Sequence, residues 1–290
     1  MKKFRISTLL IYLVISIFTL VCLIPMVLTL IVSFTDESSI MRNGYSFIPE
    51  KLSLYAYNLM FQGGSNVIRG YGISIFITIV GTFLALGITG LAAYTLSNKN
   101  VKYRNTISFY FYVTMIFSSG VVPWYMICSA VHTKDNIFAL LIPSLLFNPF
   151  NLFLVRNFMD GLPNSLRESA TIDGANDAYI AFKIYFPLSV PALATVGLFY
   201  GLAYWNDWWN AIMLVDNDKL YPIQYFLLQL RSNIQMLRDL QFLSSTGAST
   251  PPAESLKMAT AIITIGPIVM LYPFLQKYFV KGLIVGSVKG

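Results

Sequence analysis

A single carboxylate, Asp207, lies within the aromatic and amide-rich run YWNDWWN at residues 204–210. An ionisable side chain at membrane depth costs about 2.5 to 3.5 kcal/mol on insertion scales and usually faces a cavity or a partner. Flat aromatic faces beside hydrogen-bonding groups suit sugar rings, which have C–H faces and hydroxyl edges. An aromatic belt, a helix contact and a contact with an extracytoplasmic protein are the alternatives. The candidate substrate-pathway residues are Tyr204, Trp205, Asn206, Asp207 and Trp208.

A hydrophilic stretch, RESATIDGANDAYIAFKIYFP at residues 167–187, separates two apolar segments. Ser165 and Glu168 have the spacing of a capping box, which predicts that a helix begins directly after residue 164. Gly174 is expected to end or bend this helix, because glycine adopts unusual backbone angles and allows close approach of another chain. A second short helix is expected over residues 176–185. Taken alone, these features also fit a helix pair resting on lipid headgroups.

The composition predicts that the chain lies in a membrane. Hydrophobic residues make up 56% and charged residues only 11% of the 290 residues, whereas about a quarter of the residues of a soluble protein are charged. Uncharged stretches long enough to cross about 30 Å of hydrocarbon occur six times. We therefore expect an all-α membrane protein with one transmembrane domain over residues 1–290 and a loop at 160–186. The six expected spans are 8–34, 72–97, 106–131, 136–157, 187–214 and 257–278.

Basic residues predict how these spans are oriented. Short clusters precede the first span (Lys2, Lys3, Arg5) and follow the second (Lys99, Lys102, Arg104), and short basic loops usually stay in the cytoplasm. Both termini and the 160–186 loop are therefore expected inside, with the loops 36–69 and 216–257 outside.

Motifs of several enzyme classes are missing from the sequence. No GxxxxGK phosphate-binding loop, HExxH pair or GxSxG elbow occurs, so the chain is not expected to hydrolyse ATP or to hold a cofactor or metal. Cys22 and Cys128 are interpreted as small apolar residues, and His132 as a surface residue. No basic patch interleaved with aromatic residues suggests nucleic-acid binding.

The hydrophilic stretch has the spacing of a known motif. Glu168, Ser169 and Ala170, three residues, Gly174, nine residues, Ile184, one residue, Phe186 and Pro187 resemble the EAA signature of ABC importer permeases. Serine replaces its second alanine and phenylalanine its leucine. The segments SGVVPWYMI (119–127), ALATVGLFYGLAYWNDWWNAI (192–212) and YPFLQKYFVKGLIVGSVKG (272–290) look like the carbohydrate-uptake permeases, of the MalG-like, LplC-type branch.

This resemblance implies a type I ABC importer permease fold with six transmembrane helices and a cytoplasmic coupling helix. It implies that Glu168 contacts an ATP-hydrolysing subunit and that Ala170 and Gly174 allow close packing. The C-terminal segment 282–290 is expected to contact either that subunit or anionic lipid. The ATPase-coupling residues implied by the resemblance are Glu168, Ser169, Ala170, Asp173, Gly174, Ile184 and Pro187.

The implied partners are a second related permease, two cytoplasmic ATPase subunits that bind ATP and Mg, and an extracytoplasmic solute-binding protein. The implied location is the plasma membrane of a prokaryote, and the implied cargo is a carbohydrate, in particular an oligosaccharide. The alternatives are an importer of the same architecture for a peptide, polyamine or polyol, an ion-coupled secondary transporter and a membrane enzyme. A secondary transporter would predict inverted repeats and several intramembrane carboxylates.

Overall fold

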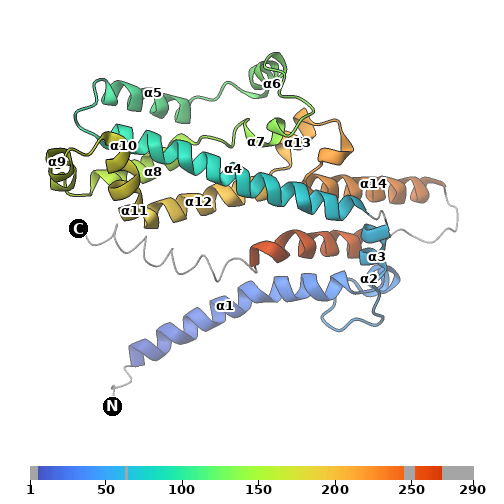
Figure 1. Ribbon diagram of the computed structural model, residues 1–290. Coiled ribbons are helices and arrows are strands. Elements are labelled where there is room, and N and C mark those ends of the chain that lie inside the picture. Colours follow the sequence, from blue (N-terminus) through green and yellow to red (C-terminus); the bar gives the residue numbers. More distant parts are fainter. Residues whose placement is uncertain (1–5, 63–64, 245–251, 270–290) are drawn as a thin grey trace. The chain divides into compact units, whose positions relative to one another are not determined.

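The computed structural model describes residues 6–62, 65–244 and 252–269. The regular secondary structure of these residues is helical, and one isolated bridge, Thr35 to Leu52, is the only β-type pairing among them. The all-helical class predicted from the sequence is confirmed. Residues 253–269 form the last described helix. The labelled helices of Figure 1 are α1 (Ile6–Ser33), α2 (Glu37–Asn43), α3 (Tyr55–Gln62), α4 (Ser65–Ser97), α5 (Arg104–Ile116), α6 (Val121–Ala130), α7 (Phe138–Leu141), α8 (Pro149–Asp160), α9 (Ser165–Ile172), α10 (Asp177–Ile180), α11 (Phe186–Leu188), α12 (Val190–Trp205), α13 (Trp209–Leu214) and α14 (Ile223–Ser244), with a π-helix η1 (Ala181–Tyr185) and a 3₁₀ turn η2 (Asp218–Leu220).

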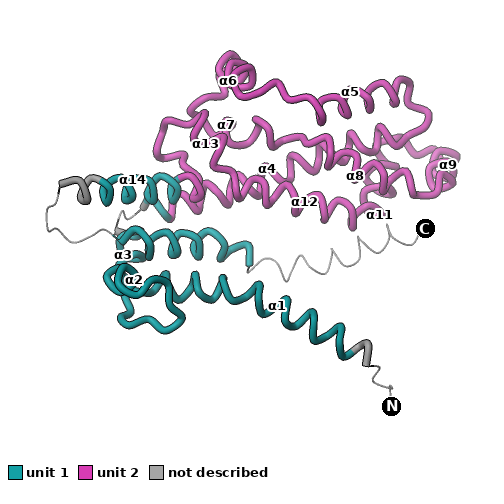
Figure 2. Tube along the Cα trace, turned by 180° about the vertical axis from the view of Figure 1, so that it is seen from behind, with its two compact units in different colours: residues 1–67, 226–270 teal, residues 68–225, 271–290 magenta. Residues whose placement is uncertain are grey.

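The chain divides into two compact units, coloured separately in Figure 2. Unit 1 comprises residues 1–67 and 226–270, and unit 2 comprises residues 68–225 and 271–290. The hydrophilic stretch 167–187 and the aromatic run 204–210 both belong to unit 2.

Two helices in the described residues are long and apolar enough to cross a membrane, Leu9–Ser33 and Asn66–Ser97. Two pairs of helices pass the same test when each pair is taken together. The chain bends by 116° between α5 and α6, and by 81° between residues 177–188 and α12. The described part of the chain thus contains two to four candidate spans. The six spans expected from the sequence stay a prediction, and the expected span 257–278 runs beyond the described residues.

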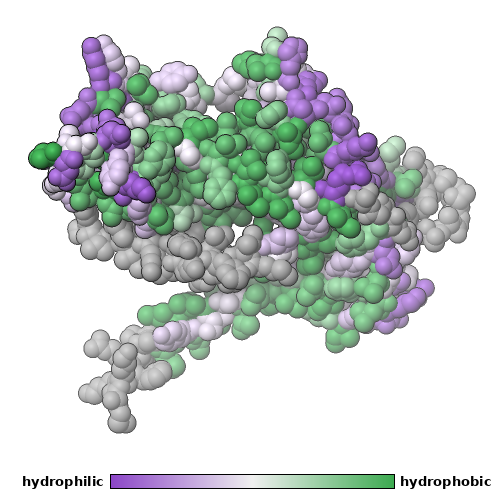
Figure 3. Space-filling model, in the orientation of Figure 1, coloured by the Kyte–Doolittle hydropathy of each residue, from purple (hydrophilic) through white to green (hydrophobic). Residues whose placement is uncertain are grey.

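In unit 2, polar and apolar side chains are separated along the helices, as expected for a protein that crosses a membrane. Figure 3 shows that apolar side chains cover the middle of this unit on the face drawn, while hydrophilic side chains gather at its two ends. One end carries α9 and the basic loop between α4 and α5, and the other carries α13 and η2 (Figure 1). Exposed apolar side chains such as Phe83 and Phe109 are suited to contact with lipid tails.

In unit 1, a buried carboxylate caps the helix 253–269. Glu37 is only 8% exposed. It accepts hydrogen bonds from the backbone N–H of Glu254 and of Ser255, both at 3.0 Å, and from the Ser255 hydroxyl at 2.9 Å. Free N–H groups at a helix start favour a negative charge. This contact joins the expected outer loop 36–69 to the start of the last described helix.

Glu254 extends this network with its own carboxylate. It accepts hydrogen bonds from the Tyr45 hydroxyl at 2.6 Å, from Lys257 at 2.9 Å and from Arg238 at 3.1 Å. The hydrogen bond from Tyr45 is the main cause that lowers the pKa of Glu254, and it raises the pKa of Tyr45 to about 12. Glu254 therefore stays ionised at neutral pH and holds two cations beside the helix.

In unit 2, α4 and α12 pack closely because small residues face large ones. At Gly81 a Cβ atom would overlap the ring of Tyr204, which is fully buried, and at Gly197 it would lie 3.0 Å from Leu86. Small residues are common where membrane helices approach closely. Gly81 in α4 and Gly197 in α12 therefore set the distance between these two helices.

This packing gives a matched pair of substitutions on one helix. Gly81→Ala is expected to cost about 1 to 3 kcal/mol, because the buried Tyr204 ring must move to accommodate one methyl group. Gly87→Ala meets no atom within 4 Å and is expected to leave stability unchanged or slightly improved. Thermal unfolding of the two variants in detergent measures the difference. Equal melting temperatures would show that α4 and α12 do not pack as described.

Candidate functional site

The stretch 160–186, which the resemblance implies is a coupling loop and which is called the coupling loop below, folds as a series of short helices with a glycine turn between α9 and α10. After α9, Gly174 adopts a left-handed φ of 81°. Its N–H donates to the Thr171 carbonyl at 3.1 Å, and the next N–H, of Ala175, donates to the Ala170 carbonyl at 2.9 Å. These two bonds form a Schellman motif, which glycine favours. A Cβ on Gly174 would meet nothing within 4 Å, so within this chain the glycine is needed for its backbone angle.

The helix α9 begins at Ser165, as predicted, but the predicted capping box is wrong. Asn164 occupies the N-cap position in a helical conformation, and no side chain caps the helix. Instead, the N–H groups of Leu166 and Arg167 donate to the carbonyls of Pro163 and Asn164. Glu168 is therefore not used as a cap, and its exposed carboxylate has no hydrogen-bond partner in the described part of the chain.

The predicted coupling residues differ in their exposure. Ala170 is 7% exposed and belongs to the core of unit 2, and Ile184 is partly buried. The other five are exposed: Glu168, Ser169, Asp173, Gly174 and Pro187. The structure adds Ile172, which is 85% exposed on the same helix. The sequence offered one signal for Ile172, a large apolar residue at the end of a helix that is mostly hydrophilic.

An arginine that the sequence analysis did not single out ties α9 to α4. The Arg167 guanidinium lies 4.7 Å from the ring centre of Tyr94 in α4 and 4.9 Å from that of Tyr185 in η1. Asp177 approaches it at 4.0 Å and accepts a hydrogen bond from the Tyr94 hydroxyl at 3.2 Å. The Arg167 side chain is only 12% exposed, so cation–π attraction acts in a partly desolvated site. We call these four residues the Arg167 latch.

The predicted pathway residues do not form one surface. Tyr204, Trp205 and Asp207 are buried, at 0%, 6% and 8% exposure, whereas Asn206 and Trp208 are exposed. The Tyr204 hydroxyl donates to the Leu141 carbonyl at 2.7 Å. Helix α12 ends at Trp205, and buried and exposed side chains alternate over residues 205–208.

Asp207 has a structural partner within the chain. Its Oδ1 accepts the Asn210 backbone N–H at 3.2 Å in the first turn of α13, where free N–H groups favour an anion. The Asn210 side-chain amide in turn donates to the Pro143 carbonyl at 3.0 Å. Asp207 Oδ2 is buried with no hydrogen-bond partner among the described residues. The carboxylate thus organises the turn between α12 and α13.

A break within the expected span 136–157 forms a pocket that the sequence analysis did not find. Helix α7 ends at Leu141 and α8 begins at Pro149. Asn148 caps α8 by accepting the N–H groups of Phe150 at 2.9 Å and Asn151 at 3.4 Å, and proline is favoured in the first helical turn. A pocket of about 280 Å³ lies beside this break. It is lined by Ser144, Leu145, Asn148, Phe150, Asn151, Phe199, Tyr200 and Ala203.

The groups that line this helix-break pocket suit a hydroxylated ring. Asn151 is 5% exposed, and its side-chain amide has no hydrogen-bond partner in the part of the chain that the structure describes. The Tyr200 hydroxyl accepts the Asn148 N–H at 3.0 Å and lies 2.7 Å from the Thr89 hydroxyl. Phe150 and Phe199 expose ring surface. The amide atoms of Asn151 are not among the sealed, unpaired polar atoms of the described residues, so the amide is accessible and can donate to and accept from a hydroxyl or water in the pocket.

Comparison with known proteins identifies the family. Residues 79–285 match the family model of the binding-protein-dependent transport system inner membrane component. The chain belongs to this family. It is 36% identical to the polygalacturonan/rhamnogalacturonan transport system permease protein YtcP of Bacillus subtilis, over 99% of this chain and 100% of that one. It is also 36% identical to LplC of the same bacterium, over 93% of this chain and 90% of that one.

A solved structure supports the same conclusion for the fold. The permease is similar, with a TM-score of 0.80 and 27% identity, to a chain of a bacterial ABC transporter involved in the import of the acidic polysaccharide alginate. The match covers 96% of this permease and 98% of that chain. The protein is thus the non-catalytic membrane permease of a binding-protein-dependent ABC importer, and its resemblance to LplC-type permeases is confirmed. A secondary transporter and a membrane enzyme are excluded by this assignment.

The Arg167 latch of the permease leads to a test of coupling. Arg167→Gln keeps a polar side chain but loses two cation–π contacts, each worth about 0.5 to 2 kcal/mol. We expect uptake to fall about 5- to 10-fold while ATP hydrolysis continues, because the loop no longer moves rigidly with α4. Arg167→Lys should fall between, and Lys183→Gln, which removes an exposed charge from the same loop, should behave as wild type. The ratio of ATP hydrolysed to cargo imported in proteoliposomes is the measurement, and an unchanged ratio would contradict the role.

Proposed function

We propose that this permease carries a carbohydrate oligomer into the cell, driven by ATP hydrolysis in a partner subunit. Relatives with carbohydrate cargo in their descriptions support this: polygalacturonan/rhamnogalacturonan for YtcP, and arabinooligosaccharides for AraQ of Halalkalibacterium halodurans, which is 29% identical over 93% of this chain and 92% of its own. The helix-break pocket adds a physical argument, because its amides and exposed rings match the hydroxyls and C–H faces of a sugar.

The cargo pathway in this proposal runs along the helix-break pocket and the turn after α12. Tyr200 and Ala203 line the pocket from α12, and the same helix continues to Tyr204 and Trp205. The exposed Asn206 and Trp208 extend the path beyond the helix, and Asp207 holds the turn in place through α13. Asp207→Ala is therefore expected to disturb this turn as well as any contact with cargo.

The coupling loop is the part that receives force from the ATPase, and α9 is the observation that carries the proposal. It presents an exposed isoleucine, Ile172, beside the exposed carboxylate of Glu168. Its other face is held to α4 and η1 by Arg167. A helix that is apolar on an exposed face and anchored on the other is suited to dock into a groove of a partner and to pass on its movement.

The proposed topology has six spans with both termini in the cytoplasm. The basic loop between α4 and α5 lies at the same end of unit 2 as α9 (Figure 1), which agrees with a cytoplasmic coupling loop. The spans proposed remain 8–34, 72–97, 106–131, 136–157, 187–214 and 257–278, within one permease domain. The tail 282–290, for which contact with the ATPase or with lipid is expected, lies outside the described residues.

The proposed assembly contains a second related permease, two cytoplasmic ATPase subunits that bind ATP and Mg, and an extracytoplasmic binding protein. Closure of the ATPase pair would carry the coupling loop as a rigid body and tilt α8 and α12, so that the cavity opens outward. Hydrolysis reverses the movement. A binding protein loaded with cargo can shift this equilibrium only by favouring the closed ATPase.

Co-purification tests the proposed function. The wild-type permease should retain its ATPase subunits through purification, and Glu168→Lys should lose them, because the charge reversal lies on the docking helix. Asp218→Lys, a charge reversal at the other end of unit 2, is the matched control and should retain the ATPase. Retention by all three proteins would refute docking through α9, and absence of an ATPase from the wild type would refute the assembly.

A further inference from the structure

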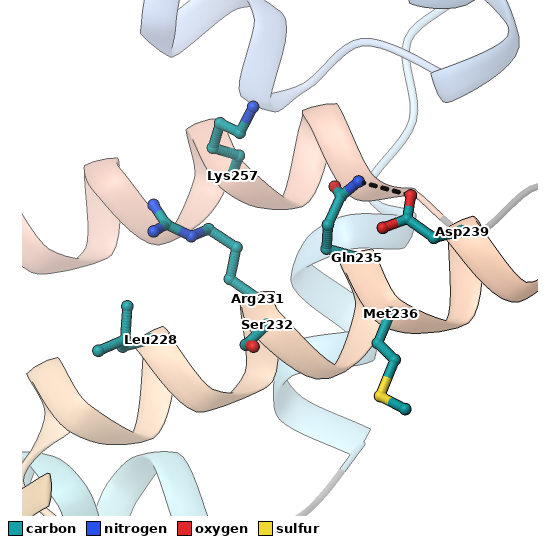
Figure 4. Close-up of a pocket in the computed structure, with 7 residues that line it drawn as sticks. All are labelled: Leu228, Arg231, Ser232, Gln235, Met236, Asp239 and Lys257. Atoms are coloured by element: carbon teal, nitrogen blue, oxygen red, sulfur yellow. Dashed lines mark hydrogen bonds between the residues drawn. The ribbon is translucent and has the colours of Figure 1, made fainter.

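Unit 1 contains a groove of about 710 Å³ between α14 and the helix 253–269. This volume lies within the range of small-molecule sites, roughly 300 to 1,000 Å³. In the proposed topology both flanking segments belong to the outer loop 216–257 and the start of the last span, so the groove faces outward. The residues that line it are Leu228, Arg231, Ser232, Gln235, Met236, Asp239 and Lys257 (Figure 4).

The lining of this groove carries two cations, Arg231 and Lys257, and one carboxylate, Asp239. Figure 4 shows Arg231 and Lys257 on the two helices that flank the groove, with Gln235 and Asp239 farther along α14. Lys257 pairs with Glu254 at 2.9 Å, and Glu254 also pairs with Arg238 at 3.1 Å. Arg231 has no hydrogen bond or ion pair to any residue that the structure describes. The Glu254 carboxylate therefore serves two cations, whereas Arg231, which also lines the groove, has no anionic partner among the described residues.

The planar guanidinium of Arg231 matches a carboxylate, because its parallel N–H groups can bind both carboxylate oxygens. The remaining lining groups match the rest of a sugar acid. The Ser232 hydroxyl can donate and accept, and the Asp239 carboxylate, which accepts from Gln235 at 3.1 Å, can accept further hydrogen bonds from hydroxyls. Leu228 and Met236 supply apolar surface for C–H faces.

We propose that this groove binds a uronate unit of the cargo, with Arg231 reading its carboxylate, so that the importer selects acidic saccharides at its outer face. This inference rests on the proposed function and adds a substrate class to it. An acidic surface of a partner protein could also bind Arg231. Such a surface would not require a concave site with the volume of a sugar and with both donors and acceptors in its lining. Such a surface is treated as an outcome of the test.

The test measures sugar binding to the complete importer in nanodiscs of zwitterionic lipid, without binding protein, by saturation-transfer NMR. The two probes are trigalacturonate and its fully methylated ester, which share a skeleton and differ in charge. We expect wild type to bind the acid at least tenfold more tightly than the ester. Arg231→Gln should lose about 10- to 100-fold in affinity for the acid, Arg231→Lys should lose less, and the ester should be unaffected.

Arg42→Gln is the matched control, because Arg42 is exposed on α2 of the same unit and does not line the groove. It should bind the acid as wild type does. Equal binding of the two probes, no binding by wild type, or an unchanged Arg231→Gln variant would overturn the inference. It would also be overturned if Arg231→Gln lowered only the stimulation of ATP hydrolysis by the binding protein, which would assign Arg231 to a protein interface.

The same nanodiscs separate this inference from the proposed function. Stimulation of ATP hydrolysis by the loaded binding protein tests whether the assembly is an ATP-driven importer, whatever the charge of its cargo. An importer that responds to its binding protein but ignores uronates retains the proposed function and loses the uronate site. An assembly that never responds loses the proposed function, and the binding data still decide whether the groove recognises a carboxylate.

Discussion

Ile172→Asp is expected to reduce carbohydrate uptake by about 50-fold or more, with the permease present at normal abundance in the membrane. The Ile172 side chain is 85% exposed on α9, and burying it against a partner contributes roughly 1.5 to 3 kcal/mol. Aspartate removes that contribution and adds the cost of desolvating a charge at the contact. The stability of the isolated permease should not change, because the Ile172 side chain is almost fully exposed in the described structure and loses little packing there.

The control for this substitution is Ile48→Asp. Ile48 is the same residue type with the same 85% exposure, but it lies in the outer loop 36–69, away from the proposed ATPase contact. Uptake, abundance and ATPase co-purification of the two variants are compared with wild type. If Ile48→Asp lost the ATPase to the same extent, exposure alone would explain the effect and α9 would have no special role.

Asn151→Leu is expected to raise the KM for carbohydrate uptake at least tenfold and to leave the melting temperature unchanged or slightly higher. Asn151 is 5% exposed and lines the helix-break pocket, and its amide has no partner in the described residues. Leucine has nearly the same size, and it leaves no donor or acceptor without a protein partner at this mostly buried position. A site that hydrogen-bonds a hydroxyl discriminates strongly, so losing its amide should weaken cargo binding.

Asn58→Leu is the matched control for this substitution. Asn58 is exposed on α3 and has no side-chain hydrogen bond in the described chain, so uptake by this variant should match wild type. Transport by proteoliposomes over a range of cargo concentrations separates KM from the maximal rate. A KM of Asn151→Leu equal to that of wild type would exclude the pocket from the cargo pathway.

Local sequence was sufficient for features that depend on neighbouring residues. The run that forms α1 is uncharged because burying an ionised side chain in a bilayer is costly. It is helical because a helix satisfies the backbone hydrogen bonds within the segment itself. The start of α9 at Ser165 and the turn at Gly174 follow from residues close in sequence, and the EAA-like spacing was enough to recognise the family that the comparisons confirm.

Long-range packing decided the features that the sequence analysis missed. Arg167 reads as one more charge in a hydrophilic loop until folding brings it between Tyr94 and Tyr185. The span expected at 136–157 is broken, because Asn148 and Pro149 start a new helix whose cap is held by Tyr200 from α12.

The sequence by itself therefore determined the membrane location, the all-helical class and the family, through its EAA-like spacing, since hydropathy and spacing are properties of contiguous residues. The tertiary structure decided that Tyr204 and Asp207 are packed inside while Ile172 faces outward, and that Asn151 and Tyr200 line one pocket. Exposure and shared cavities depend on which helices meet, and α4 and α12 meet closely where Gly81 faces Tyr204 and Gly197 faces Leu86.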